Sequence, residues 1–197
     1  MKKILCLFVI CFLLLSFSGC NNKNLKTRRD FENLYLEALD GKIDFYLDNK
    51  KQNINLFLNE LKENNKEIKI SYALTKIKNN DNKFSYALVA YFEGNDGYYL
   101  IFTYNDILDR VIAKEEGYRS MTIIKNDMTV MGSSGTGNNV ISEIRCDNNG
   151  AKLIVLANSD DNYIINGKDV TEEEYDKYIE EFEGKNDLKF IDYKSLK

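Results

Sequence analysis

Apolar residues recur every three or four positions in two segments near the start of the chain, and this spacing predicts amphipathic helices. The first segment begins at Asp30 and ends near Gly41, and the second begins at Asn53. The apolar positions are Phe31, Leu34, Tyr35 and Ala38 in the first segment, and Ile54, Phe57, Leu58 and Leu61 in the second. Each helix therefore has an apolar stripe that must pack against another part of the protein.

From Ile68 onward the period of the apolar residues changes to two, which is typical of half-buried strands. Turn-forming segments such as NNDNK, EGNDG, DNNG and NSDD separate the strand candidates. Successive strands with short loops and no helix between them predict an antiparallel meander. The segments FSYALVAYF (84–92) and YYLIFTY (98–104) are apolar on both faces, so we expect them to be central strands.

The segment VTEEEYDKYIEEF (170–182) predicts a C-terminal helix with a well-defined start. Thr171 can accept a hydrogen bond from the Glu174 amide while the Glu174 side chain bonds back, which is a capping box. The predicted class is therefore α+β: an antiparallel β-meander sheet with N-terminal amphipathic helices and a C-terminal capping helix.

The first twenty residues, MKKILCLFVICFLLLSFSGC, have a basic start, an apolar run and small residues directly before Cys20. This order resembles a bacterial lipoprotein signal, in which the cysteine receives diacylglycerol and becomes the new N-terminus. The apolar run suits the core of a signal peptide and is short for a bilayer span of ~20 residues. The alternative is an ordinary secretory signal with a chance cysteine. We expect a lipoprotein signal peptide at 1–19, a polar tether at 20–29 and a single extracytoplasmic domain at 30–197. The protein would then be anchored by lipid to the cell membrane and face outside the cytoplasm.

The charge of the chain narrows the choice of partners. Loss of Lys2 and Lys3 with the signal takes the 27 basic side chains to 25 against 31 acidic ones, a net charge of about −6. Nucleic acid and anionic lipid attract clustered Lys and Arg. We therefore expect no nucleic-acid partner, and membrane attachment through covalent lipid rather than a basic patch.

The chain has no histidine, which excludes a Ser-His-Asp triad, a Cys-His pair and a histidine-ligated zinc. Cys6 and Cys11 leave with the signal and Cys20 carries lipid, so Cys146 has no partner for an intramolecular disulfide. Its place in the alternating pattern predicts a buried, unreactive thiol. We expect no cofactor, and we assign no catalytic or metal-ligating residue.

The part of the chain from Tyr86 to Tyr193 has a distinct order of features. YALVAYFEGNDGYYLIFTY places an acidic turn between an apolar and an aromatic strand, and GYRSMTI, MTVMGSSGTG and YIINGKDVTEEEYDKYIEEF follow. This order resembles a group of uncharacterised lipoproteins and secreted proteins common in clostridia, and the resemblance implies a small extracytoplasmic domain with no established activity. In that group the turn looks like a calcium loop, but here only Asp96 and Gly97 match it. Calcium needs several oxygen ligands, so we interpret the turn at 92–100 as a plain hairpin turn.

The glycine-rich segment VMGSSGTGNN (130–139) has the glycine spacing of a phosphate-binding loop. Asn138 and Asn139 stand where Lys and Ser/Thr would be, and no histidine exists to activate Ser134 as a nucleophile. We interpret the segment as a turn between two strands. The alternative is a loop that lines a ligand pocket, with Ser134 as a contact.

Aromatic residues are the other candidates for binding. Tyr98 and Tyr104 share one face of a predicted strand and Tyr99 lies on the other. Core packing is the favoured interpretation, and an exposed aromatic strip for a sugar or a protein partner is the alternative.

We expect a lipid-anchored binding or interaction module at the cell envelope. We favour a binding protein over an enzyme. Its partner would be an envelope protein, a wall glycan or a small solute. The alternative is a histidine-independent hydrolase of envelope glycans that uses a pair of carboxylates. The candidate carboxylates are Asp160, Asp161, Glu172, Glu173 and Glu174.

Overall fold

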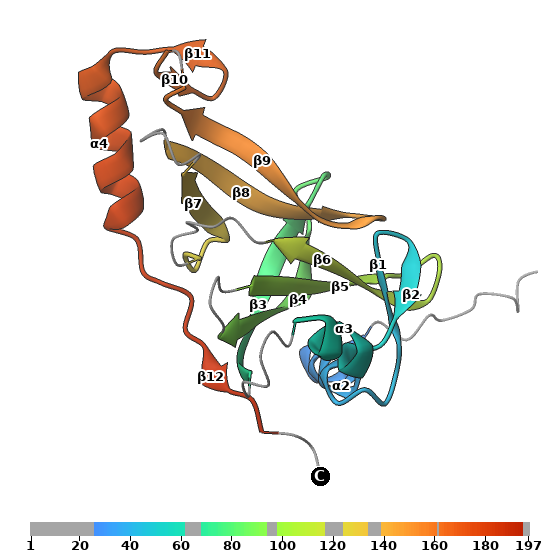
Figure 1. Cartoon of the computed structure of the whole chain (residues 1–197). Helices are drawn as coiled ribbons and strands as arrows, with labels where there is room; N and C mark the ends of the chain where they lie inside the picture. Colours follow the sequence, from blue (N-terminus) through green and yellow to red (C-terminus); the bar gives the residue numbers. More distant parts are fainter. Residues whose placement is uncertain are drawn as a thin grey trace, which may run out of the picture.

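The computed structural model describes residues 26–61, 68–93, 98–116, 124–133, 139–160 and 162–194. These residues form a mixed α and β structure in which a large, curved sheet dominates (Figure 1). The helices are α2 (Arg28–Leu39), α3 (Ile54–Leu61) and α4 (Glu172–Glu183). The combination of helices with a strand-rich sheet confirms the coarse class predicted from the sequence.

Twelve strands make up the sheet. They are β1 (Phe45–Leu47), β2 (Lys50–Gln52), β3 (Lys69–Asn79), β4 (Phe84–Glu93), β5 (Tyr98–Asn105), β6 (Arg110–Glu116), β7 (Thr129–Ser133), β8 (Asn139–Asp147), β9 (Gly150–Asn158), β10 (Ile164–Ile165), β11 (Lys168–Asp169) and β12 (Ile191–Asp192). Their order is β11-β10-β9-β8-β3-β4-β5-β6-β1-β2, with β7 paired to β8 and β12 paired to β3. β4 and β5 are interior strands, as the apolar character of both their faces predicts.

Three pairings join strands that are not consecutive and so depart from a simple meander, and one of them is the antiparallel pairing of β12 with β3. β6 lies beside β1, and β3 lies beside β8, and both of these pairings are parallel. Most other neighbours are antiparallel and consecutive along the chain. Alternating polarity predicts that a segment is a strand, but it carries no information on which distant strand becomes its neighbour.

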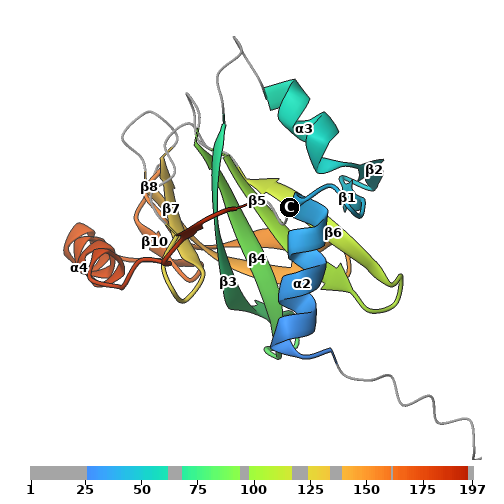
Figure 2. The same cartoon turned by 90° about the horizontal axis from the view of Figure 1, so that it is seen from below.

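One side of the β3–β6 region is covered by the two N-terminal helices (Figure 2). Thr27 caps α2 through a capping box with Asp30, and the Tyr35 hydroxyl donates to the Tyr86 carbonyl oxygen at 2.9 Å. The buried side chains of this first core are Phe31, Tyr35, Ala38, Leu39, Phe45, Ile54, Phe57, Leu88, Ala90, Phe92, Leu100, Phe102, Val111 and Ala113. No helix among the described residues is both long and apolar enough to cross a membrane.

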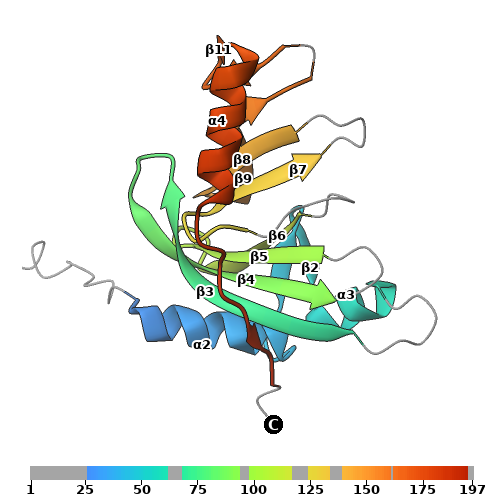
Figure 3. The ribbon, with the colours of Figure 1, turned by 90° about the vertical axis from the view of Figure 1, so that its left-hand side faces the viewer.

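The opposite side of the same strands packs against β7, β8 and β9, which bend away from them toward α4 (Figure 3). Ala73, Val89 and Ile101 meet Met128 and Ile144 in this second core. A third cluster holds Tyr175 and Phe182 of α4 against Met131, Ile141 and Ala157. The predicted capping box of α4, with Thr171 and Glu174, is present.

The C-terminal segment after α4 hydrogen-bonds both to the segment before β7 and to β3. Leu188 donates its amide to the Ile124 carbonyl oxygen at 2.7 Å, and the Tyr193 amide donates to the Ile70 carbonyl oxygen at 2.9 Å. Between them, β12 pairs with β3 through Ile191 and Tyr72. This last stretch of chain therefore bridges from the segment before β7 to the first half of β3.

Candidate functional site

The middle of β3 has a strand neighbour on one side only. β4 pairs with β3 along nearly its whole length. On the other side, β12 pairs with Ser71 and Tyr72, and β8 pairs with Lys78 and Asn79. Among the described residues, no strand pairs with 73–77 on that side. We call this interval the β3 gap.

The direction of the backbone groups in the β3 gap follows from the alternation of a strand. Ile70 directs its carbonyl oxygen toward β12, where it accepts from Tyr193, whereas the Asn79 amide bonds across the hairpin to Lys83. Even-numbered residues of β3 therefore present their N–H and C=O groups to the open side, and odd-numbered residues bond to β4. Leu74 and Lys76 are the two even-numbered residues within the gap.

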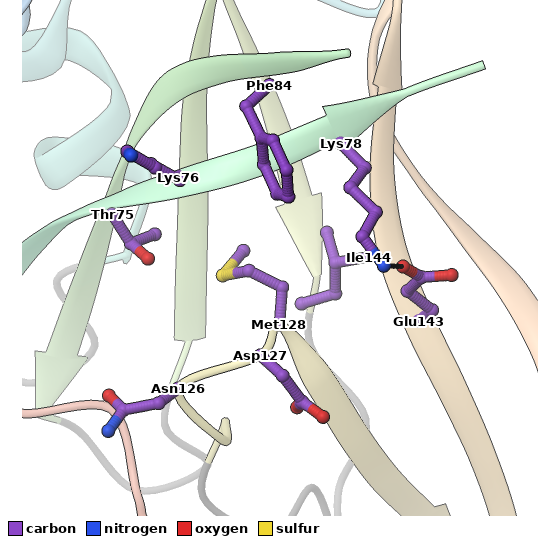
Figure 4. Close-up of a pocket in the computed structure, with 9 residues that line it drawn as sticks. All are labelled: Thr75, Lys76, Lys78, Phe84, Asn126, Asp127, Met128, Glu143 and Ile144. Atoms are coloured by element: carbon purple, nitrogen blue, oxygen red, sulfur yellow. Dashed lines mark ion pairs between the residues drawn. The ribbon is translucent and has the colours of Figure 1, made fainter. Parts of the chain in front are cut away.

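A pocket of about 210 Å³ lies against this edge (Figure 4). It is lined by Thr75, Lys76, Lys78, Phe84, Asn126, Asp127, Met128, Glu143 and Ile144. The lining residues come from β3, β4, the turn before β7, and β8. The β3 gap and the pocket are thus one opening. It lies between the edge of β3 on one side and β8 with the turn before β7 on the other.

Buried Glu143 is the acidic centre at one end of the pocket. Its carboxylate lies 3.3 Å from Lys78 Nζ and 2.7 Å from Arg145 Nη2, and it accepts a further hydrogen bond from Arg145 Nε at 2.7 Å. Arg145 in turn donates to the Asn82 side-chain oxygen at 3.3 Å. Two cations thus hold one carboxylate, which offsets its burial and braces β8 against the β3–β4 hairpin.

Asp127 is the second carboxylate of the pocket. It accepts from the Thr129 hydroxyl at 2.5 Å and from the Thr129 amide at 3.0 Å, and Lys185 Nζ lies 2.8 Å away. Burial raises the pKa of Asp127, but the hydrogen bonds from Lys185 and Thr129 outweigh burial and bring this pKa below its ordinary value. A general acid needs a raised pKa, so Asp127 is suited to structural bonding rather than proton donation.

The remaining lining combines the apolar residues Phe84, Met128 and Ile144 with the polar Thr75 and Asn126, and Lys76 places a positive charge at the rim. Met128 and Ile144 are almost fully buried at the floor, whereas the Phe84 ring is 64% exposed. Lys76 is exposed at the rim. Because both carboxylates are already bound by cations, the Lys76 ammonium gives the open side a local positive charge.

Two of the tyrosines predicted as weak binding candidates, Tyr99 and Tyr104, lie in different cores. Tyr99 is buried among Tyr91 and Phe190 in the second core, and burial raises its pKa to about 12. Tyr104 packs on the first core, where it contacts Phe31. The side chain of Tyr98 lies outside the described residues, as do Ser134, Cys20 and the centre of the 92–100 turn.

Other sequence-based interpretations can be placed more directly. The glycine-rich segment connects β7 to β8, and these two strands pair antiparallel, so a strand and not a helix follows it. Cys146 is buried and is a free cysteine, and burial raises the pKa of its thiol. No cluster of side chains suited to a metal ion occurs in the described part of the chain.

The carboxylates considered for a hydrolase lie at the start of α4 and in the turn after β9. Glu174 is engaged in the capping box, and Glu172 hydrogen-bonds Tyr163. Asp160 and Glu173 are exposed, and Asp161 lies outside the described residues. None of the four that are described lines the pocket beside β3.

Sequence reasoning missed the β3 gap. Ile68 to Thr75 has the alternation of a strand, but nothing in the alternation shows that neighbouring strands end before its middle. The one available signal is the pair Lys76 and Lys78 with the apolar Phe84 across the turn, an exposed charge pattern next to a large ring. Comparison with models of protein families, with curated proteins and with solved structures finds no match. The site must therefore be interpreted from its own geometry.

Proposed function

We propose that this protein is a lipid-anchored, extracytoplasmic binding protein of the cell envelope, and that it binds an extended peptide segment of another envelope protein in the β3 gap. The site would belong to a single extracytoplasmic domain at 30–197, with N-terminal amphipathic helices and a C-terminal capping helix on a largely antiparallel sheet. Cys20 would carry the lipid. The observation that supports peptide binding is the open edge at Leu74 and Lys76 beside a pocket.

An added strand matches this edge because its affinity comes from main-chain hydrogen bonds and its specificity from side-chain pockets. Two outward-facing residues offer two N–H and two C=O groups, enough for a peptide of a few residues. Met128, Ile144 and Phe84 suit an apolar side chain of that peptide, and Lys76 suits an acidic one. Three of the six polar lining side chains, Lys78, Asp127 and Glu143, are already ion-paired and so less available to a sugar.

The proposal is tested by site-specific photo-crosslinking in intact cells. The full chain carries a benzoylphenylalanine in place of Phe84, which keeps an aromatic ring at the mouth of the pocket. The matched control carries the same group in place of Leu56, a 58% exposed residue on α3. We expect a protein adduct from position 84 and none of the same mass from position 56.

The adduct must also depend on the edge of β3. Lys76→Pro removes an outward N–H and should abolish the adduct, whereas Lys76→Gln keeps the N–H and should retain most of it. An adduct that survives Lys76→Pro would contradict strand addition. No adduct from position 84 at all would contradict a protein partner at this site.

A further inference from the structure

The turn between β5 and β6 carries two large apolar side chains into solvent. This turn spans 106–109, and Ile107 is 73% exposed and Leu108 is 54% exposed. They are adjacent in sequence, so the two side chains form one apolar tip. Isolated exposed apolar residues are common on proteins, but a pair at the tip of a hairpin needs a reason.

The tip is held in place by hydrogen bonds. The side-chain oxygen of Asn105 accepts from the amides of Ile107 and Leu108, both at 2.9 Å. The Asn105 side-chain nitrogen donates to the Asn148 carbonyl oxygen at 2.5 Å, which ties this turn to the turn between β8 and β9. The apolar side chains are therefore presented by a fixed turn, and ordering them on contact with a partner costs little.

The start of the described chain lies against the same hairpin. Lys26 Nζ donates to the Tyr104 hydroxyl at 2.8 Å, lies 4.1 Å from the centre of the Tyr104 ring, and is 3.7 Å from the Asp109 carboxylate. Leu108 directly precedes Asp109, and neighbouring Cα atoms are about 3.8 Å apart. The point where the tether joins the domain is thus beside the apolar tip.

The length of the tether limits how far this point can lie from the membrane. Cys20 and Lys26 are separated by six peptide steps, each of which spans at most ~3.6 Å, so the lipid and the tip lie within about 20 Å plus the reach of the side chains. A tether this short holds the tip at high effective concentration near the lipid surface. At that effective concentration a weak apolar contact is enough to keep the tip at the membrane.

We propose that Ile107 and Leu108 insert into the outer leaflet of the membrane to which Cys20 is attached, and so fix the orientation of the domain. This inference rests on the proposed lipid anchor. Lys26 lies against the Asp109 carboxylate of the turn, and Arg28 and Arg29 follow in the first turn of α2. Asp106 and Asp109 flank the apolar pair, and Lys26 is paired with Asp109, so the base of the tip carries charges of both signs. The contact with a phospholipid surface is therefore made by the apolar tip.

The chain contains no tryptophan, so a single introduced tryptophan reports on one position without background. The full-length lipidated protein with Leu108→Trp is placed in phosphatidylglycerol–phosphatidylcholine vesicles whose acyl chains carry bromine, a quencher of tryptophan fluorescence. The matched control is Ile191→Trp, because Ile191 is 56% exposed and its strand lies on the other side of the molecule from the β5–β6 turn (Figure 1). Flotation of the vesicles measures anchoring independently.

We expect both variants to float with the vesicles, and only Leu108→Trp to show a blue-shifted emission that brominated lipid quenches by more than half. The quenching should persist in high salt, since the contact is apolar. Equal emission and equal quenching of the two variants, with both still floating, would overturn the insertion and leave the anchor intact. Quenching that high salt removes would also overturn it, because basic residues would then carry the contact. Failure of both variants to float would overturn the anchor, and the proposed insertion with it.

Discussion

Neighbouring amides in β3 point in opposite directions, so the open edge at the β3 gap can be tested by measurements of protein stability alone. Thr75 and Lys76 are adjacent, and the alternation of the strand directs the Thr75 amide to β4 and the Lys76 amide into the gap. Proline removes the amide hydrogen at either position. We therefore expect Thr75→Pro to destabilise the protein strongly and Lys76→Pro to destabilise it little.

The expected magnitudes follow from the partners of the two amides. Thr75 lies opposite Ala87, which is completely buried, so loss of the Thr75 N–H leaves a buried carbonyl oxygen without its bond. An unsatisfied buried group costs about 1–3 kcal/mol, and the proline ring adds strain in the interior of a sheet, so the total for Thr75→Pro is about 3 kcal/mol. Lys76→Pro removes no ladder bond and should cost about 1 kcal/mol or less, as for proline at a sheet edge.

Thermal unfolding followed by circular dichroism measures the difference. For a domain of this size each kcal/mol shifts Tm by roughly 2–4 °C, so Thr75→Pro should lower Tm by about 6–12 °C and Lys76→Pro by about 4 °C or less. Equal losses, or a larger loss for Lys76→Pro, would refute the assignment of the open edge. The substitutions Thr75→Ala and Lys76→Ala control for loss of the side chains.

Three further predictions concern charge, backbone strain and the anchor. The pKa of Asp127 is lowered in the folded protein, so its ionised form stabilises the fold above the unfolded pKa of about 4. This stabilisation is lost as pH falls through the folded pKa. The difference in unfolding free energy between the protein and Asp127→Asn should therefore be constant from about pH 5 to 7 and shrink in acid. Gly150 has φ +112°, and an added Cβ would lie 2.9 Å from Ile112 Cγ2, so Gly150→Ala should cost about 2–3 kcal/mol in urea unfolding. Gly167 has φ +74° with open space around it, so Gly167→Ala should cost only about 1 kcal/mol, and equal costs would show that the contact with Ile112 yields freely. Cys20→Ala should move the protein out of the detergent phase in detergent-phase partitioning, and unchanged partitioning would count against lipidation.

The sequence predicts local structure well where one face of a segment is buried. The capping box of α4 and the interior position of β4 and β5 follow from residue patterns alone. The β1–β2 hairpin is different, since each strand has only three residues and β2 is KKQ, without any apolar residue. β1 is fixed by its parallel pairing to β6, through Tyr46 and Ile112, and such a distant contact leaves no local pattern.

The candidate site depends on the same kind of distant contact. The gap exists because β12 ends its pairing at Tyr72 and β8 begins its own at Lys78. Each of these limits is set by tertiary packing, and neither can be seen in the alternation of β3. The tyrosines that drew attention in the sequence are abundant because aromatic residues fill the cores, as the buried Tyr99 and the half-buried Tyr104 show.

The pairing of β12 with β3 also sets an order of events during synthesis. The chain emerges N-terminus first, so β3 is complete long before Ile191 becomes available to pair with Tyr72. During that interval the open edge of β3 is longer than in the finished protein, and an unpaired edge is a template for wrong pairing between chains. β12 thus acts as a closing strand that shortens a hazardous edge of β3. A truncation at about residue 185 should therefore lower the yield of soluble monomer more than it lowers the helix content, and size-exclusion chromatography of the truncated and full chains would measure that difference.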